Sequence, residues 1–99
     1  MLAAAYLGLG SNLGDRRLNI AEAVKRLRQV SSKVSFSSLY ETAPQGFSGQ
    51  PAFLNAACRI WTPLSPFELL QYLREIQSDL GSPPAFVNGP RTLDVDIPL

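Results

Sequence analysis

Histidine is absent from this 99-residue chain, and cysteine occurs once, at Cys58. Without histidine, the usual ligand sets of zinc sites and acid–base catalysis by an imidazole are excluded. A single cysteine cannot form an internal disulfide bond, and it is compatible with a reducing compartment. Because Cys58 lies in an apolar run, we interpret it as a small buried residue rather than a reactive thiol.

The chain also has little net charge, +1 at pH 7, so no broad basic surface for nucleic acid or a membrane is expected. The apolar run at residues 1–9 is too short to span a bilayer, and no basic residue precedes it. We interpret this run as a buried strand, and we expect a cytoplasmic protein. The length and ordinary composition predict one globular domain over residues 1–99.

Hydrophobic periodicity predicts four strands and two helices. The strands cover residues 2–9, 34–40, 53–61 and the residues from 91 onwards, and the helices cover 16–29 and 66–80. Asp15 is the expected N-cap of the first helix. The second helix begins with a capping box, Ser65 to Glu68, and ends at Gly81. Its expected buried stripe is Leu69, Leu70, Leu73, Ile76 and Leu80.

This β-α-β-β-α-β order predicts an α+β fold of the ferredoxin-like type, with two helices on one face of a four-stranded antiparallel sheet. Apolar residues alternate with others in the third and fourth strands and should face the helices. These residues are Leu54, Ala56, Cys58, Ile60, Leu93, Val95 and Ile97. Phe53, Asn55, Asp94 and Asp96 should therefore share the open face, and the irregular segments 41–51 and 81–90 can fold over it. An exposed final strand can pair edge to edge, so we expect a monomer or a weak dimer.

Asp94 and Asp96 are the candidate metal ligands. Two residues apart on a strand, their side chains start roughly 7 Å apart and can hold one or two Mg²⁺ ions. Arg91 precedes them and can reach a phosphate bound to the ions, a combination typical of phosphate transfer. The alternative is a solvated strand with two exposed acids, and the alternation alone favours this alternative because alternating acids are common on sheet surfaces.

Two further stretches are candidate ligand sites. The glycine-rich turn at residues 8–14 follows a strand, but its third glycine is one residue late for a dinucleotide fingerprint, so a tight turn explains it better. Residues 42–46 and 53–55 can form a flat pocket. In it, Asn55 offers a donor and an acceptor to a fused pyrimidine ring, and Phe53 offers a stacking face. A plain surface loop is the alternative.

Four ordered motifs resemble those of the 6-hydroxymethyl-7,8-dihydropterin pyrophosphokinases of folate biosynthesis. They are YLGLGSNLGD (6–15), SSLYETAP (37–44), QPAFLNAA (50–57) and GPRTLDVD (89–96), so the resemblance covers nearly the whole chain. It implies an enzyme that transfers diphosphate from ATP to the hydroxymethyl group of the pterin and releases AMP. Its partners would then be small molecules, ATP and a reduced pterin.

The resemblance also implies roles for individual residues. Arg91, Asp94 and Asp96 would be catalytic, and the two aspartates would hold two Mg²⁺ ions. The pterin would contact Gly10, Thr42, Ala43, Gln45, Phe53 and Asn55. ATP would contact Leu70, Arg74, Gln77, Arg91 and Ile97.

The chain departs from the family pattern at several positions. Asn88 stands where tryptophan is usual, residues 82–84 replace a basic stretch, Arg74 and Gln77 replace other polar residues, and Pro98 lies inside the last strand. The family also continues well past this strand, so we interpret the chain as the N-terminal part of a pyrophosphokinase domain, truncated at its C-terminus. The alternative function is a catalytically incomplete ferredoxin-like module that binds a pterin or a partner chain.

Overall fold

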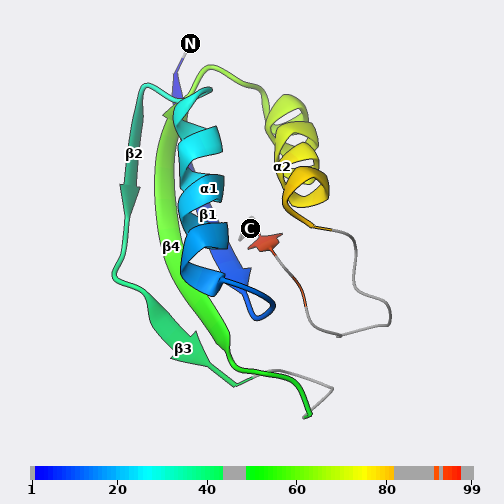
Figure 1. Cartoon of the computed structure of the whole chain (residues 1–99). Coiled ribbons are helices and arrows are strands. Elements are labelled where there is room, and N and C mark those ends of the chain that lie inside the picture. The colour runs from blue at the N-terminus through cyan, green and yellow to red at the C-terminus, as the bar shows by residue number, and fades with distance from the viewer. Residues whose placement is uncertain (1, 44–48, 82–90, 92, 97–99) are drawn as a thin grey trace.

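The computed structural model describes residues 2–43, 49–81, 91 and 93–96, which form two helices and an antiparallel sheet (Figure 1). The elements are β1 (Ala3–Ser11), α1 (Arg16–Arg28), β2 (Lys33–Phe36), β3 (Tyr40–Thr42), β4 (Phe53–Thr62), α2 (Pro66–Leu80) and β5 (Asp94–Asp96). None of the helices in these residues is long and apolar enough to cross a membrane.

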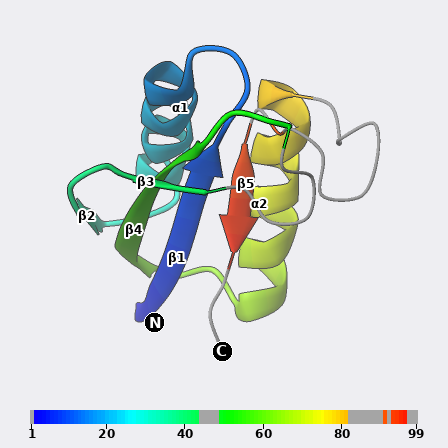
Figure 2. The same cartoon turned by 90° about the horizontal axis from the view of Figure 1, so that it is seen from below.

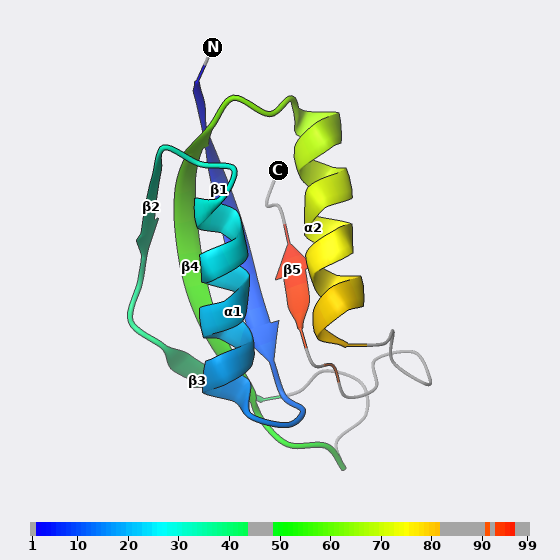
Figure 3. The same cartoon turned by 45° about the horizontal axis from the view of Figure 1, so that its top comes forward.

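The strands lie in the order β2-β4-β1-β5, and β3 also pairs with β4. Figure 2 shows β1 between β4 and β5. Each helix therefore joins two strands that are separated by a third, which is the split βαβ arrangement. Both helices cover the same face of the sheet (Figure 3). The predicted α+β, ferredoxin-like architecture is confirmed.

Local capping explains where the helices begin. The Asp15 carboxylate accepts a hydrogen bond from the backbone N–H of Leu18 at 3.1 Å, so it is the N-cap of α1. At α2, Ser65 and Glu68 form the predicted capping box, in which each side chain accepts from the other residue's backbone N–H. The first helix ends at Arg28, one residue earlier than predicted, and Gln29 is its C-cap.

The single strand predicted at residues 34–40 is wrong, because it is two strands, and the sheet therefore has five strands rather than four. Phe36 pairs with Cys58 and Tyr40 pairs with Asn55, so three residues of one segment lie opposite two of β4. This count is that of a β-bulge. At the bulge, the Ser37 hydroxyl accepts from the backbone N–H of Ala57 at 2.9 Å and takes the place of a regular ladder bond.

The core lies between the helices and the sheet. Its buried members are Leu7, Leu9, Ile20, Ala23, Val24, Leu27, Leu54, Ala56, Cys58, Ile60, Leu69, Leu73, Ile76 and Leu93. This confirms the predicted helix-facing set of β4 and most of the stripe of α2. Leu70 is the error in that stripe, because it is 40% exposed. Ile97 lies outside the described residues.

Candidate functional site on the open face of the sheet

The strand pairings bring residues from four strands into one row across the open face. Gly10 on β1 pairs with Asn55 on one side and with Asp94 on the other. Asn55 also pairs with Tyr40 on β3. Because directly paired residues of an antiparallel sheet project to the same face, Tyr40, Asn55, Gly10 and Asp94 lie side by side. Asn55 and Asp94 are therefore grouped as predicted, because both pair with Gly10 in the register of β1 with β4 and β5.

The bulge before β3 determines which of its residues join this row. The extra residue reverses the alternation that β2 had set, so Tyr40 and Thr42 pair with Asn55 and Phe53 rather than with helix-facing residues. Without the bulge, Thr42 would point toward the helices. A single inserted residue thus aligns Thr42 with the predicted ligand pocket.

Gly10 forms the floor of this region. A Cβ atom at residue 10 would lie 3.0 Å from Oδ1 of Asn55 and 3.4 Å from Cδ1 of Phe53. The first distance is shorter than normal packing allows, so only glycine leaves both neighbouring side chains in place. The glycine keeps the surface between Asn55 and Asp94 flat.

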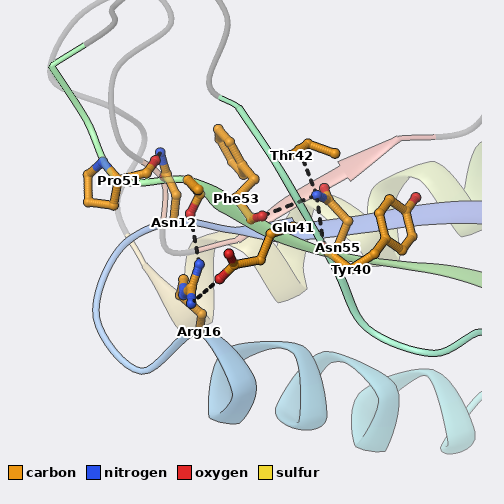
Figure 4. A network of polar contacts seen from close by, with 9 residues as sticks. Asn12, Arg16, Tyr40, Glu41, Thr42, Pro51, Phe53 and Asn55 are labelled. Carbon is orange, nitrogen blue, oxygen red and sulfur yellow. Dashed lines mark hydrogen bonds and ion pairs between the residues drawn. The ribbon is translucent and has the colours of Figure 1, made fainter.

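The Asn55 side chain is held in a defined orientation. Its Nδ2 atom donates to Oγ1 of Thr42 at 2.8 Å and lies 3.4 Å from the carbonyl oxygens of Tyr40 and Phe53 (Figure 4). Its Oδ1 atom is turned toward Gly10. A planar heterocycle over Gly10 would therefore meet a fixed acceptor at this edge. Ala43 follows Thr42 and is exposed, and Gln45 lies outside the described residues.

Arg91 connects the aromatic and acidic parts of the site. Its guanidinium carbon lies 5.9 Å from the centroid of the Phe53 ring, and its NH1 atom lies 3.3 Å from Oδ2 of Asp94. The side chains of Arg91 and Asp94 are each about a quarter to a third exposed, so a ligand can reach both. The predicted grouping of Arg91 with Asp94 is present, and Phe53 belongs to it as well.

Two residues that were not predicted hold the site together. Asn12 is 1% exposed and contacts both Arg91 and the segment before β4. Arg16 donates to the carbonyl of Ala52 at 3.0 Å and forms an ion pair with Glu41 at 2.7 Å. The sequence offers a signal for Asn12: it is a polar residue directly after β1, whose last residues are buried, and a buried polar side chain needs hydrogen-bond partners.

Three of the residues predicted to contact ATP, Leu70, Arg74 and Gln77, lie on α2. Leu70 and Arg74 are exposed on α2. Gln77 donates from Nε2 to the Leu93 carbonyl at 3.5 Å, so it links α2 to the start of β5. Asp96 pairs with Gly8, but its side chain, like residue 97, lies outside what the structure describes.

The carboxylate of Asp94 is the kind of ligand that a hard divalent cation takes. Asp94 carries a carboxylate on rigid strand backbone, and a positive group, the Arg91 guanidinium, already lies against it. Mg²⁺ prefers such oxygen ligands and usually completes its shell with water and substrate phosphates. In the residues that the structure describes, no group of three or more His, Cys, Asp or Glu side chains could hold a metal ion.

Comparison with known proteins identifies the family of this chain. A family model described as 7,8-dihydro-6-hydroxymethylpterin-pyrophosphokinase (HPPK) matches residues 6–99. The chain belongs to the HPPK family. The match contains the whole row from Asn55 to Asp94, together with Asn12 and Arg91.

Several curated HPPK relatives are similar over nearly the whole chain. A 2-amino-4-hydroxy-6-hydroxymethyldihydropteridine pyrophosphokinase of Bacillus subtilis is 45% identical over 95 residues, which are 94% of this chain and 57% of that protein. An Aquifex aeolicus protein of the same name is 39% identical over 96 residues, 97% of this chain and 60% of that protein. The folic acid synthesis protein FOL1 of Dictyostelium discoideum is 44% identical over 92 residues, 93% of this chain and 14% of that protein. The chain thus spans less than two thirds of these relatives.

Proposed function

We propose that this chain supplies the pterin-binding and metal-binding sheet of an enzyme that transfers diphosphate from ATP to 6-hydroxymethyl-7,8-dihydropterin and releases AMP. The main support is the row that register creates, in which the acceptor of Asn55, the bare floor of Gly10 and the carboxylate of Asp94 lie on adjacent strands. A flat ligand over Gly10 would then have one edge beside the Asn55 amide and its opposite edge beside the Asp94 carboxylate, where the phosphates would bind. The substrates are small molecules, and we propose a cytoplasmic monomer or weak dimer.

On the pterin side, each residue has a separate task. Asn55 accepts a hydrogen bond from the ring edge through Oδ1, because the 2.8 Å hydrogen bond from Nδ2 to Thr42 fixes the orientation of its amide. Phe53 stacks on the ring face, and the Arg91 guanidinium above it adds a cation–π contact to the same aromatic. Ala43 and Gln45 supply further contacts from the segment that follows β3.

On the phosphate side, we propose that Asp94 and Asp96 hold two Mg²⁺ ions and that Arg91 binds the phosphates. Such ions would neutralise negative charge on the phosphate oxygens of ATP, so that the hydroxyl oxygen of the pterin can approach the phosphorus. Arg91 exchanges its contact with Asp94 for a phosphate oxygen, which keeps a positive charge close to the bond that breaks. Leu70, Arg74, Gln77 and Ile97 complete the nucleotide side. This chemistry requires positioning and charge neutralisation rather than a strong base, which is compatible with the absence of histidine.

Calorimetry with Mg²⁺ and a non-hydrolysable ATP analogue tests the metal assignment. The chain should bind the analogue only with Mg²⁺, and the double variant Asp94→Ala, Asp96→Ala should lose this binding by about 100-fold or more. Asp79→Ala is the matched control, because Asp79 is also paired with an arginine, Arg26, but on the helices. Identical binding by the chain and the double variant would contradict the assignment.

A second measurement separates an enzyme from a binding module. The chain is incubated with ATP, Mg²⁺ and hydroxymethyl-dihydropterin, and AMP release is followed beside the quenching of pterin fluorescence. AMP release that disappears in the aspartate double variant supports the enzyme. Quenching without any AMP release would instead support a pterin-binding module.

A further inference from the structure

We propose that Asn12 is a positioning residue that sets the place of Arg91 relative to the pterin pocket. The proposal rests on the function proposed above, because it assigns Arg91 and Phe53 to one reaction site. Asn12 contacts neither the pterin nor the phosphates in this scheme. It acts through the backbone on both sides of the site.

The first part of the argument is how Arg91 is held. Its backbone N–H donates to Oδ1 of Asn12 at 2.7 Å, and its backbone carbonyl accepts from the N–H of Asn12 at 3.1 Å. Both backbone polar groups of residue 91 are therefore fixed to one residue at the end of β1. The guanidinium projects from this fixed backbone to its position 5.9 Å from the Phe53 centroid and 3.3 Å from Asp94.

The second part of the argument concerns the Nδ2 atom of the Asn12 side chain. Nδ2 of Asn12 donates to Oε1 of Gln50 at 2.6 Å and to the carbonyl of Pro51 at 3.1 Å. Figure 4 shows Asn12 next to Pro51, at the start of the segment that leads to Phe53. The Asn12 amide thus binds Arg91 through Oδ1, and it binds the segment before Phe53 through Nδ2. The side chain of Asn12 therefore connects the backbone of Arg91 directly to the segment that leads to Phe53.

The residue type fits this task closely. Asparagine combines an acceptor and a donor on one side chain, whereas aspartate would present an oxygen to Gln50 and Pro51 instead of a donor. Asn12 is almost fully buried, so each unpaired group left by a substitution would be costly. A purely structural role would need the same hydrogen bonds, and the two roles must be separated by experiment.

Asn19 provides the matched control for such an experiment. Its Nδ2 atom donates to Oγ of Ser11 at 3.1 Å and to the carbonyl of Leu13 at 2.9 Å. Its side chain therefore supports the same turn between β1 and α1 from the helix side. If Asn12 only stabilised the turn, Asn12→Ala and Asn19→Ala should have similar effects.

The first test needs no ligand. In NMR spectra of the full chain, the δ-methylene protons of Arg91 should be shifted by the Phe53 ring current, and this shift should disappear in Phe53→Leu. It should also be lost in Asn12→Ala and remain in Asn19→Ala. Asn12→Asp, which keeps the acceptor for the Arg91 N–H, serves where Asn12→Ala does not fold, and it should lose the shift because the segment before Phe53 is released. A shift that persists in the Asn12 variants, or is lost equally in Asn19→Ala, overturns the proposal.

The second test is a double-mutant cycle on AMP release. Asn12→Ala should lower kcat by about 10- to 100-fold, the scale expected for a misplaced catalytic group. In an Arg91→Ala background it should cause no further loss of kcat, because the group that it positions is gone. Losses that add in the double variant would overturn the proposal. If the chain neither binds nor turns over its substrates, the proposed function fails, and the ring-current test still decides the role of Asn12.

Discussion

Gly10 and Asn55 are directly opposed across β1 and β4, and a Cβ atom on residue 10 would lie 3.0 Å from Oδ1 of Asn55. The same atom would lie 3.4 Å from the Phe53 ring. The space above this glycine is therefore limited by the two side chains that we assign to the pterin. Any side chain at residue 10 must displace at least one of them.

We therefore expect Gly10→Ala to impair both pterin binding and stability. The methyl group should push Asn55 away from Thr42, weaken pterin binding by about tenfold or more, and cost about 1–3 kcal/mol of stability through overpacking. Fluorescence quenching gives the affinity and urea unfolding gives the stability. Ala4→Val adds bulk to the open face farther along β1 and should leave the affinity unchanged. Normal pterin affinity in Gly10→Ala would mean that the ligand does not lie over this glycine.

The Glu68 carboxylate should make the stability of α2 depend on pH. Its hydrogen bond from the Ser65 N–H lowers the pKa of this carboxyl below the ordinary value of 4.5. A lowered folded-state pKa means that the contribution is present above the unfolded-state value and is lost as pH falls through the folded-state value. Urea unfolding at a series of pH values between 7 and 2 should show a smaller loss at low pH in Glu68→Gln. Glu75→Gln removes a carboxylate from the same helix away from the cap and should behave like the unmodified chain.

The thiol of Cys58 should be inert in the native protein. Burial raises the pKa of this thiol, and the charge of Arg28 offsets the effect only in part. The residue is 3% exposed in the core, so a disulfide reagent reaches it only after local or global unfolding. At pH 7.5 the reaction should be slower by at least about 100-fold in the native chain than in 6 M urea. Equal rates would show that β4 opens readily.

Tyr72 should contribute to the contact between the two helices. Its hydroxyl donates to the Arg26 carbonyl at 2.7 Å, and the Arg26 guanidinium lies 5.5 Å from its ring centroid. Tyr72→Phe removes the hydrogen bond and keeps the ring, so it should lower the free energy of unfolding by about 0.5–1.5 kcal/mol. Tyr6→Phe, on the exposed face of β1, should change it by less than about 0.5 kcal/mol. Equal effects of the two substitutions would argue against the helix contact.

Alternation and capping made most of this fold predictable from the sequence. The helix-facing residues of β4 alternate strictly, and the Ser65–Glu68 capping box begins α2 where it was expected. Both signals are local, so they can be read without knowing what packs against them. The bulge between β2 and β3 was missed because it arises from the register with β4, which lies about 20 residues later. Leu70 was misassigned because it lies beside the buried stripe in sequence but outside it on the helix surface.

The candidate site was predictable to a similar extent. Strand alternation was sufficient to put Phe53 and Asn55 on the open face. The contact between Arg91 and Phe53 was not foreseeable, because it depends on where Asn12 fixes residue 91. Hydrogen bonds between residues 38 and 79 positions apart leave no periodic trace in a sequence.

The connection between Asn12 and Arg91 also bears on how the chain folds. The two residues are 79 positions apart, so their contact closes most of the chain into one loop and carries a corresponding entropic cost. The pairing of β1 with β4 places Gly10 beside Asn55 without residue 91 or β5. A chain in which only β1 and β4 have paired therefore already has Gly10 and Asn55 side by side, before β5 places Asp94. Under the proposed function, the residues assigned to the pterin can therefore be placed without those assigned to the phosphates, whereas the reverse order would require the long loop to close first.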